Sequence, residues 1–159
     1  MKNKLSTLGP RHQIAALPWR QSGASVEVLL ITSRLSRHWL IPKGWPMKGK
    51  SPSAAAAREA LEEAGIKGAI SQEPVGRYQY DKISLDGAVI PCVVDVYPLL
   101  VKQELDEWQE AATRTRSWMP IETASMLAYE GGLSDLLAQL DHNILATGLP
   151  SRPKKAARR

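Results

Sequence analysis

The sequence predicts a layered α/β fold, because strand patterns and helix patterns alternate along one chain. Runs rich in β-branched residues indicate strands, an alanine-rich stretch indicates a helix, and leucines at helical spacing follow near the end. With 159 residues, 43% of them hydrophobic, the chain suits one domain with its own core. We expect this domain at residues 10–147, between a flexible N-terminus at 1–9 and a basic, disordered tail at 148–159.

The first third of the chain carries strand signals. Residues 12–20 and 26–33 are apolar and rich in aliphatic or β-branched side chains, which is typical of strands. A short strand is expected at residues 39–41, where Pro42 stops it. Residues 43–50 are rich in glycine and proline, so we expect a loop there.

A helix is predicted next, at residues 54–64. Ser51 is a good N-cap, and Pro52 suits the first helical position. Gly65 is placed to end the helix, because glycine readily adopts the left-handed conformation found after a helix C-terminus. The back of this helix is mostly alanine, which allows it to approach a sheet closely.

A hairpin is predicted in the middle of the chain. Asp86 and Gly87 form a strong turn signal between strand patterns at residues 75–85 and 88–101. A further strand is expected at residues 114–119.

Two helices are predicted after Pro120, at residues 121–129 and 133–145. The second carries an apolar stripe, which we expect to pack in the core. Its members are Leu133, Leu136, Leu137 and Leu140.

Positive charge is concentrated at the two ends of the chain. Residues 151–159 hold five cations and no acid, and Lys2 and Lys4 add two more, so residues 5–150 carry a net charge of −2 although the whole chain carries +5. The body therefore lacks the basic character of a nucleic-acid-binding domain, and nucleic acid is not expected as the main partner. Weak attraction of the tail to a polyanion stays open as an alternative.

The remaining compositional features favour a cytoplasmic protein without a membrane partner. No apolar run approaches the roughly 20 residues of a membrane helix, and the basic N-terminus has no hydrophobic segment after it. Cys92 is the only cysteine, which excludes an internal disulfide, and its apolar surroundings are typical of a buried thiol. His12 and His142 are expected to be structural or exposed. The oligomeric state is not indicated.

Three glutamates crowd the end of the predicted helix. At about 100° per residue, Glu59, Glu62 and Glu63 share a face about 100° wide. Each repulsive pair costs roughly 0.2–0.5 kcal/mol, and the helix dipole disfavours the last two carboxylates by about 0.3–1 kcal/mol each. Arg58 can pair with Glu62 at i+4, but one cation does not neutralise three anions. A solvated acidic face is one interpretation, and a bound divalent cation is the other, since clustered carboxylates suit Mg²⁺ or Mn²⁺.

Residues 44–66 resemble the Nudix box, G-x5-E-x7-R-E-U-x-E-E-x-G-U, in which U is a bulky aliphatic residue. The matching positions are Gly44, Arg58, Glu59, Glu62, Glu63, Gly65 and Ile66. Ala60 is a small stand-in at an aliphatic position, and Lys50 stands where the box has its first glutamate. The stretches RHWLIPKGW, EALEEAGIKG and ELDEWQEAATRTRSWM are similar to the diphosphoinositol polyphosphate and diadenosine polyphosphate hydrolase branch of this family.

The resemblance implies an α/β/α sandwich with a mixed sheet, in which the box forms a loop–helix–loop. It also implies hydrolysis of a phosphoanhydride, that is, of a diphosphate linked to another moiety, with Mg²⁺ or Mn²⁺ as cofactor. Carried over to this chain, Glu59, Glu62 and Glu63 would be metal ligands. The Gly44 carbonyl would be a further ligand, and Glu59 would also act on water. Arg58 would orient the glutamates by pairing with Glu62.

Cationic side chains near the box are candidates for binding a small, anionic, phosphorylated substrate. These candidates are Arg34, Arg37, His38, Lys43, Lys48 and Lys50. The first three precede the loop and are expected to border the same cleft. The lysines would contact phosphate as point charges, and an ordinary solvated loop is the alternative.

Two further groups lie outside the box. Glu104, Glu107 and Glu110 form a second acidic cluster, and some Nudix enzymes use a glutamate outside the box as a base or ligand. Trp39 and Trp45 flank the Pro-Lys-Gly stretch, where packing is expected rather than base stacking.

Two classes of function are compatible with these residues. The first is a hydrolase, whose candidate substrates are diadenosine polyphosphates, inositol pyrophosphates, nucleoside diphosphate sugars and free nucleotides. The second is a binding module for nucleotide or nucleic acid, with catalysis weakened by Lys50. The intact set of Glu59, Glu62 and Glu63 favours the hydrolase.

Overall fold

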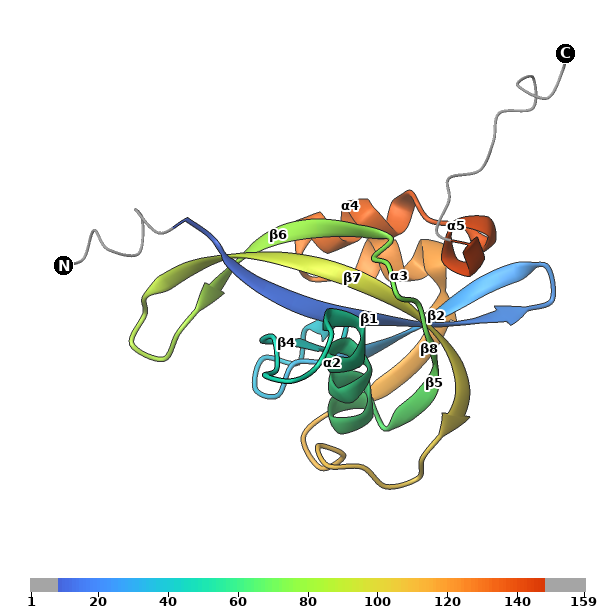
Figure 1. The fold of residues 1–159 in the computed structure, drawn as a ribbon, viewed down its shortest axis with the longest axis horizontal. Helices are drawn as coiled ribbons and strands as arrows, with labels where there is room; N and C mark the ends of the chain where they lie inside the picture. Colours follow the sequence, from blue (N-terminus) through green and yellow to red (C-terminus); the bar gives the residue numbers. More distant parts are fainter. Residues whose placement is uncertain (1–8, 148–159) are drawn as a thin grey trace, which may run out of the picture.

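The structure of the protein is a computed structural model that describes residues 9–147 (Figure 1). Its elements are β1 (Arg11–Ser22), β2 (Ser25–Thr32), β3 (Trp39–Leu40), β4 (Lys43–Gly44), α2 (Pro52–Glu59), the π-turn η1 (Ala60–Ala64), β5 (Ile66–Ile70), β6 (Gly76–Ile83), β7 (Val89–Glu104), β8 (Arg116–Pro120), α3 (Ile121–Leu127), α4 (Gly131–Ala138) and α5 (His142–Thr147). Residues 1–8 and 148–159, which include the predicted tail, lie outside the described part. Within residues 9–147, no helix has the length and apolar character needed to cross a membrane.

The strands form one mixed sheet. Its main order is β3-β2-β1-β7-β5, with β4 paired to β1, β6 to β7 and β8 to β2. β1 and β7 run parallel through nine residue pairs, and the other pairings are antiparallel. The hairpin predicted around Asp86 and Gly87 is confirmed, because β6 and β7 pair on either side of that turn.

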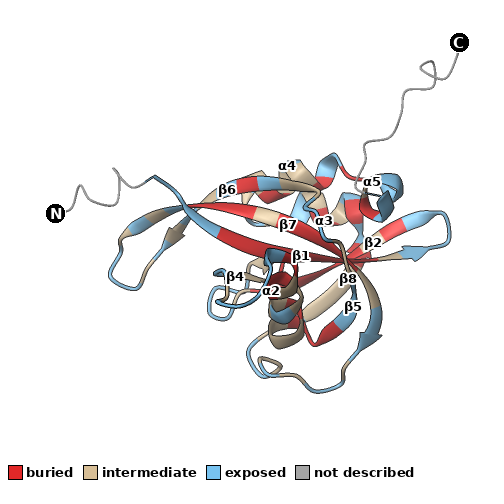
Figure 2. Cartoon of the chain, in the orientation of Figure 1, coloured by how far each residue is buried: buried red, intermediate tan, exposed pale blue. Residues whose placement is uncertain are grey.

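Helices cover both faces of the sheet, so the predicted three-layer α/β/α arrangement is confirmed. α2 and η1 lie on one face, and α3, α4 and α5 lie on the other (Figure 1). Alternate residues of β1 supply the two cores: Ala15 and Leu17 face the three later helices, whereas Ile14 and Ala16 face α2. Buried residues are accordingly concentrated in the central parts of β1 and β7 (Figure 2).

The C-terminal leucine stripe packs in the core, but the helix that carries it is shorter than predicted. Leu133 and Leu137 are fully buried, and α4 ends at Ala138. The carboxylate of Asp141 then accepts a hydrogen bond from the N–H of Ile144 at 2.9 Å, which caps a new helix. The prediction of one continuous helix over residues 133–145 is therefore wrong.

β5 was not predicted, because its sequence, IKGAI, contains a lysine and a glycine and has no clear alternation. Pairing with β7 makes it a strand, with a register shift between Lys67 and Gly68. A Cβ at Gly68 would collide with the carbonyl of Leu100 in β7. Tertiary pairing, rather than local propensity, therefore decides this strand.

The helix that carries Glu59, Glu62 and Glu63 (the glutamate helix, α2 with η1) begins as predicted but ends in a different geometry. Ser51 caps its N-terminus, and α2 continues to Glu59. The next five residues form a π-turn, in which the N–H of Gly65 reaches the carbonyl of Ala60, five residues back. The uniform projection of 100° per residue is therefore wrong for Glu62 and Glu63, because this turn is wider than an α-turn.

Gly65 is the point at which the chain leaves the helix, and we predict that Gly65→Ala destabilises the fold. Gly65 has a φ of +68°, and a Cβ there would meet the Trp108 ring at 2.7 Å. Gly23 is a matched control, with a φ of +63° and no atom within 4 Å of an added Cβ. Gly23→Ala should cost about 1–2 kcal/mol in unfolding free energy, the strain of the left-handed backbone. Gly65→Ala should cost at least about 1 kcal/mol more, because of overpacking.

Urea denaturation of both variants measures this difference. Equal losses of unfolding free energy would contradict a tight contact between Gly65 and Trp108.

Candidate active site

A cleft of about 620 Å³ brings some of the predicted acidic and basic residues together. Its charged lining residues are Arg34, Lys43, Glu59, Glu63, Lys82 and Arg114. Gly44, Trp45 and Tyr80 also line it. A second hollow of about 590 Å³ shares Lys43, Tyr80 and Lys82 with the cleft, so the two are adjacent.

Glu59 faces this cleft from the end of α2. Its pKa is raised to about 8 by desolvation, then by the charges of Glu63 and Glu62. A hydrogen bond with the Glu63 side chain also raises this pKa. A Cβ at Gly44 would collide with the Glu59 carboxylate, so only glycine permits this close approach.

Glu63 is held from two sides. Its Oε1 accepts a hydrogen bond from the backbone N–H of Lys43 at 3.3 Å, and its Oε2 lies 3.6 Å from Arg114 Nη2. Desolvation raises the pKa of Glu63, and the Arg114 charge opposes that rise. Ionisation of Glu63 therefore stays disfavoured despite this neighbouring cation.

Glu62 is engaged by a residue of its own helix. Arg58 Nε donates to Glu62 Oε2 at 2.6 Å, so the predicted i,i+4 pair is confirmed. This pair lies on the more exposed side of the helix, and neither residue is among those that line the cleft. Of the three box glutamates, Glu59 and Glu63 therefore face the cleft directly.

Only one member of the second acidic cluster reaches the box glutamates. Glu110 raises the pKa of both Glu59 and Glu63 through its charge. Glu104 instead accepts a hydrogen bond from Trp118 Nε1 at 3.0 Å, and Glu107 is exposed.

Arg114 was not predicted as a site residue. Its Nε donates to Glu110 Oε1 at 2.7 Å, and its Nη1 donates to the Thr32 carbonyl at 3.0 Å. With Glu63 at 3.6 Å, this buried guanidinium joins carboxylates from the helix and from the loop at residues 105–115. The four-residue spacing of Glu110 and Arg114 is a signal that could have identified it.

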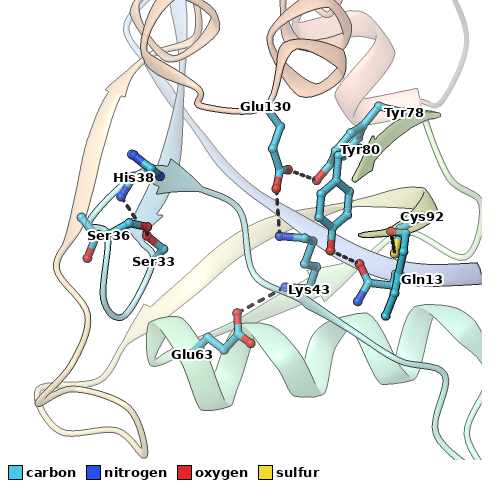
Figure 3. Close-up of polar contacts among 12 residues, drawn as sticks. Gln13, Ser33, Ser36, His38, Lys43, Glu63, Tyr78, Tyr80, Cys92 and Glu130 are labelled. Carbon is cyan, nitrogen blue, oxygen red and sulfur yellow. Dashed lines mark hydrogen bonds and ion pairs between the residues drawn. The ribbon is translucent and has the colours of Figure 1, made fainter. Parts of the chain in front are cut away.

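Lys43 connects the box to Glu130 and Tyr80, which line the second hollow (Figure 3). Its Nζ lies 3.5 Å from Glu130 Oε2 and 4.8 Å from the centre of the Tyr80 ring. Glu130 also accepts a hydrogen bond from the Tyr78 hydroxyl at 3.0 Å, and the Tyr80 hydroxyl donates to Gln13 at 2.6 Å. Glu130 was missed in the sequence, because nothing local marks a partner 87 positions from Lys43.

The expectation that Arg34, Arg37 and His38 border the same cleft is wrong for Arg37 and His38. Arg34 lines the cleft, whereas Arg37 is turned to Thr115, whose Oγ1 accepts a hydrogen bond from Nη2 at 2.6 Å. His38 lines the second hollow and stacks on Tyr129, with ring centres 3.6 Å apart.

Lys48 and Lys50 are exposed, and neither is among the residues that line the cleft. Lys50 instead borders a separate hollow, which Arg58 and Lys67 also line. Of the three lysines given as candidates for phosphate contact, Lys43 alone lines the cleft, whereas Lys48 and Lys50 are placed as the solvated-loop alternative describes.

The aromatic and histidine residues singled out in the sequence lie in different parts of the structure. Trp39 packs against the core, as expected, whereas Trp45 is partly exposed and lines the cleft. His142 contacts Trp19 edge-on at 5.5 Å, and His12 is exposed, as expected. Cys92 is buried, as its apolar surroundings predicted.

The donor types at this site fit a hard divalent cation. Carboxylates and a backbone carbonyl are the ligands that Mg²⁺ and Mn²⁺ prefer. Desolvation, and then the charges of Glu63 and Glu62, raise the pKa of Glu59, and a cation bound there would favour the ionised carboxylates. Among residues 9–147, however, no three Asp, Glu, His or Cys side chains are already arranged around one ion position. The residues therefore fit the cation in chemical kind, without a preformed cage.

Comparison with known proteins identifies relatives along most of the chain. The family model described as NUDIX domain matches residues 10–140. Nudix hydrolase 16, mitochondrial, from Arabidopsis thaliana is 37% identical over 122 residues, which cover 75% of this chain and 67% of the relative. Diphosphoinositol polyphosphate phosphohydrolase 3-beta from Bos taurus is 28% identical over 118 residues, which cover 73% of this chain and 68% of the relative.

A solved structure shows the same fold. The crystal structure of a C. elegans Ap4A hydrolase binary complex superimposes with a TM-score of 0.63 and 21% sequence identity. The match covers 87% of this chain and 99% of that chain.

The raised pKa of Glu59 predicts how stability changes with pH in the absence of metal. A carboxyl that has a higher pKa in the folded state contributes stability below its unfolded pKa of 4.5, and this stability is lost as the pH rises towards 8. Glu59→Gln should therefore be about as stable as the wild type near pH 5. Above pH 8 it should be more stable, by about 1–3 kcal/mol.

Thermal unfolding in EDTA between pH 5 and pH 9 measures this gap. Glu107→Gln, which removes an exposed glutamate outside the cluster, is the control and should show no such pH dependence. A constant gap for Glu59→Gln across this range would contradict the raised pKa.

Proposed function

The chain belongs to the NUDIX domain family and is a hydrolase of that family, and we propose that its cleft performs divalent-metal-dependent hydrolysis of a phosphoanhydride. The observation that carries this proposal is the position of Glu59 and Glu63. They lie in the same cleft as Arg34, Lys43 and Lys82. Carboxylates suit the metal, and cations suit the phosphates, so one cavity offers both kinds of group.

Each residue has a proposed task. Glu59, Glu62 and Glu63 would hold the cation, together with the carbonyl of Gly44. A divalent cation, when bound, neutralises phosphate charge and lowers the pKa of a coordinated water. Glu59 faces the cleft, so its carboxylate is the proposed acceptor of the proton from the attacking water. Arg58 would keep Glu62 oriented through their ion pair.

The phosphate side of the cleft depends on cations that the fold holds in place. Lys43 is anchored by Glu130 and by the Tyr80 ring, so its ammonium group has a defined position. Arg34 and Lys82 line the same cavity. We propose that these three cations bind the anionic part of the substrate, with Arg34 able to form paired hydrogen bonds to phosphate.

The substrate is proposed from the chemistry of the cleft and from the names of the relatives. One relative is a diphosphoinositol polyphosphate phosphohydrolase, and one similar structure is an Ap4A hydrolase. Diphosphoinositol polyphosphates and diadenosine polyphosphates are therefore the first candidates. A cytoplasmic location remains our expectation from the sequence.

A nucleotide-binding module with little catalysis is the second candidate function. The feature that favours it is the engagement of Glu62 by Arg58 at 2.6 Å, together with the lack of a preformed metal cage in the described part of the chain. Such a protein would bind a substrate in this cleft without releasing product.

A substrate panel separates the two functions. The panel contains diadenosine tetraphosphate, a diphosphoinositol polyphosphate, ADP-ribose and free nucleoside triphosphates, each with Mg²⁺, with Mn²⁺ or with EDTA. We expect phosphate or nucleotide release from at least one compound, and only with a metal ion. Binding without release from every compound would favour the binding module.

For the active substrate, Glu62→Gln and Glu63→Gln should each lower turnover at least about a hundredfold while the fold stays intact. The physical reason is the loss of a carboxylate charge at the metal. Glu107→Gln removes the same charge from an exposed position outside the cleft and should keep normal turnover. Near-normal turnover in both box variants would exclude the proposed metal site.

Lys50→Glu restores the acid of the family motif and should change the KM by less than about threefold, because Lys50 does not line the cleft. Arg34→Glu is the matched charge reversal inside the cleft. It should raise the KM at least about tenfold through repulsion of phosphate. Steady-state kinetics of both variants gives the comparison, and a large rise in KM for Lys50→Glu would mean that Lys50 contacts substrate.

A further inference from the structure

The C-terminal end of the helix formed by α2 and η1 is hydrogen-bonded by the loop that joins β7 to β8 and by the first residue of β8. A helix normally leaves its last four carbonyls without intrahelical partners. Here the Leu61 carbonyl accepts from the Gly65 N–H, and the next three carbonyls accept from loop and β8 donors. The donors are the Glu110 N–H to Glu62 at 3.1 Å, Trp108 Nε1 to Glu63 at 3.0 Å and Arg116 Nη1 to Ala64 at 2.7 Å.

Two of these donors, Trp108 and Arg116, also contact each other. The guanidinium of Arg116 lies 4.0 Å from the centre of the Trp108 ring. Its Nη2 donates to the Leu105 carbonyl at 2.7 Å, so the same side chain bonds both the helix end and the loop. Gly65 packs against both side chains, since an added Cβ would lie 2.7 Å from Trp108 and 2.8 Å from Arg116.

These hydrogen bonds are made to η1, the part of the helix that departs from α-helical geometry. Glu62 and Glu63 both lie in the π-turn, and a π-turn is rare without tertiary partners. A hydrogen bond to the backbone carbonyl of Glu63 fixes the peptide from which that side chain projects. The positive Arg116 also offsets the negative end of the helix dipole, which the two glutamates make worse.

We propose that Trp108 and Arg116 are positioning residues, which hold the π-turn so that the carboxylate of Glu63 is directed into the cleft, where the metal ion would bind. The link to catalysis rests on the proposed hydrolase function. Neither residue touches the substrate, because neither lines the cleft. They act through the backbone of the glutamates.

Trp108→Phe tests this role, because it keeps an aromatic ring near Arg116 but removes the indole N–H bond to Glu63 together with the second ring of the indole. The chain contains a closely matched control in Trp118. Its Nε1 donates to Glu104 at 3.0 Å, and Arg20 stacks on its ring at 4.1 Å. Trp118→Phe therefore makes the same chemical change beside a similar cation, away from the glutamate helix.

We expect Trp108→Phe to lower kcat at least about fivefold with KM within about twofold of the wild type, because ligand orientation changes and phosphate contacts do not. The Kd for Mn²⁺ alone, followed by electron paramagnetic resonance, should rise at least about fivefold. Deuterium uptake should become faster in the peptide that covers residues 62–66. Trp118→Phe should leave all of these unchanged and should show a similar change in Tm.

Other outcomes overturn the proposal. Unchanged kcat and Mn²⁺ affinity would mean that the contacts only stabilise the fold, even if exchange is faster. Equal effects of the two phenylalanine variants would mean general destabilisation. If the wild type hydrolyses nothing, the proposed function fails, while Mn²⁺ affinity and deuterium uptake still decide whether Trp108 positions Glu63.

Arg116→Lys provides a second variant in case Trp108→Phe does not fold. A lysine keeps the positive charge but has no planar guanidinium. It therefore cannot donate to the Ala64 carbonyl at the helix end and to the Leu105 carbonyl from two nitrogens held in one plane. The same loss of kcat and Mn²⁺ affinity is expected, and wild-type values for both would refute the role of Arg116.

Discussion

Mutual repulsion among carboxylates is the constraint around which this site is built. Glu59, Glu62 and Glu63 lie near the negative end of a helix, and Glu110 adds a further negative charge from the neighbouring loop. Burial, and then the charges of Glu63 and Glu62, raise the pKa of Glu59, so its ionised form is disfavoured without a cation. Such a cluster persists only where the surrounding structure holds it, and in hydrolases of this kind the strain is useful because a metal ion relieves it.

Three arginines help to hold the carboxylate cluster, each through different contacts. Arg58 pairs with Glu62 on the exposed side, whereas Arg114 is buried between Glu63 and Glu110. Arg116 bonds the carbonyls at the end of the helix instead of the carboxylates. Together they neutralise part of the charge and satisfy the backbone, but they leave the Glu59 carboxyl facing the cleft, where a cation can reach it.

Small side chains allow the loop that carries Lys43 and Gly44 to lie close to the helix formed by α2 and η1. The alanine face of α2 and η1 packs closely on the sheet, and Gly44 approaches the Glu59 carboxylate without a side chain between them. Lys43 then connects this loop in two directions, with its backbone N–H on Glu63 and its ammonium on Glu130 (Figure 3). A change in the loop is therefore expected to affect both Glu63, which lines the cleft, and Glu130, which lines the second hollow.

The sequence by itself determined the elements whose signals are local. Ser51, Gly65 and the Asp86-Gly87 turn could be read directly, because capping and turn geometry depend on a few adjacent residues. The i,i+4 spacing of Arg58 and Glu62 predicted their ion pair for a similar reason. Only the tertiary structure decided the rest: the π-turn, the pairing that makes β5 a strand, the position of Lys50 outside the cleft, and the joining of Glu110, Arg114 and Glu130 to the site. Each of these depends on contacts between residues far apart in the chain, for which no local pattern exists.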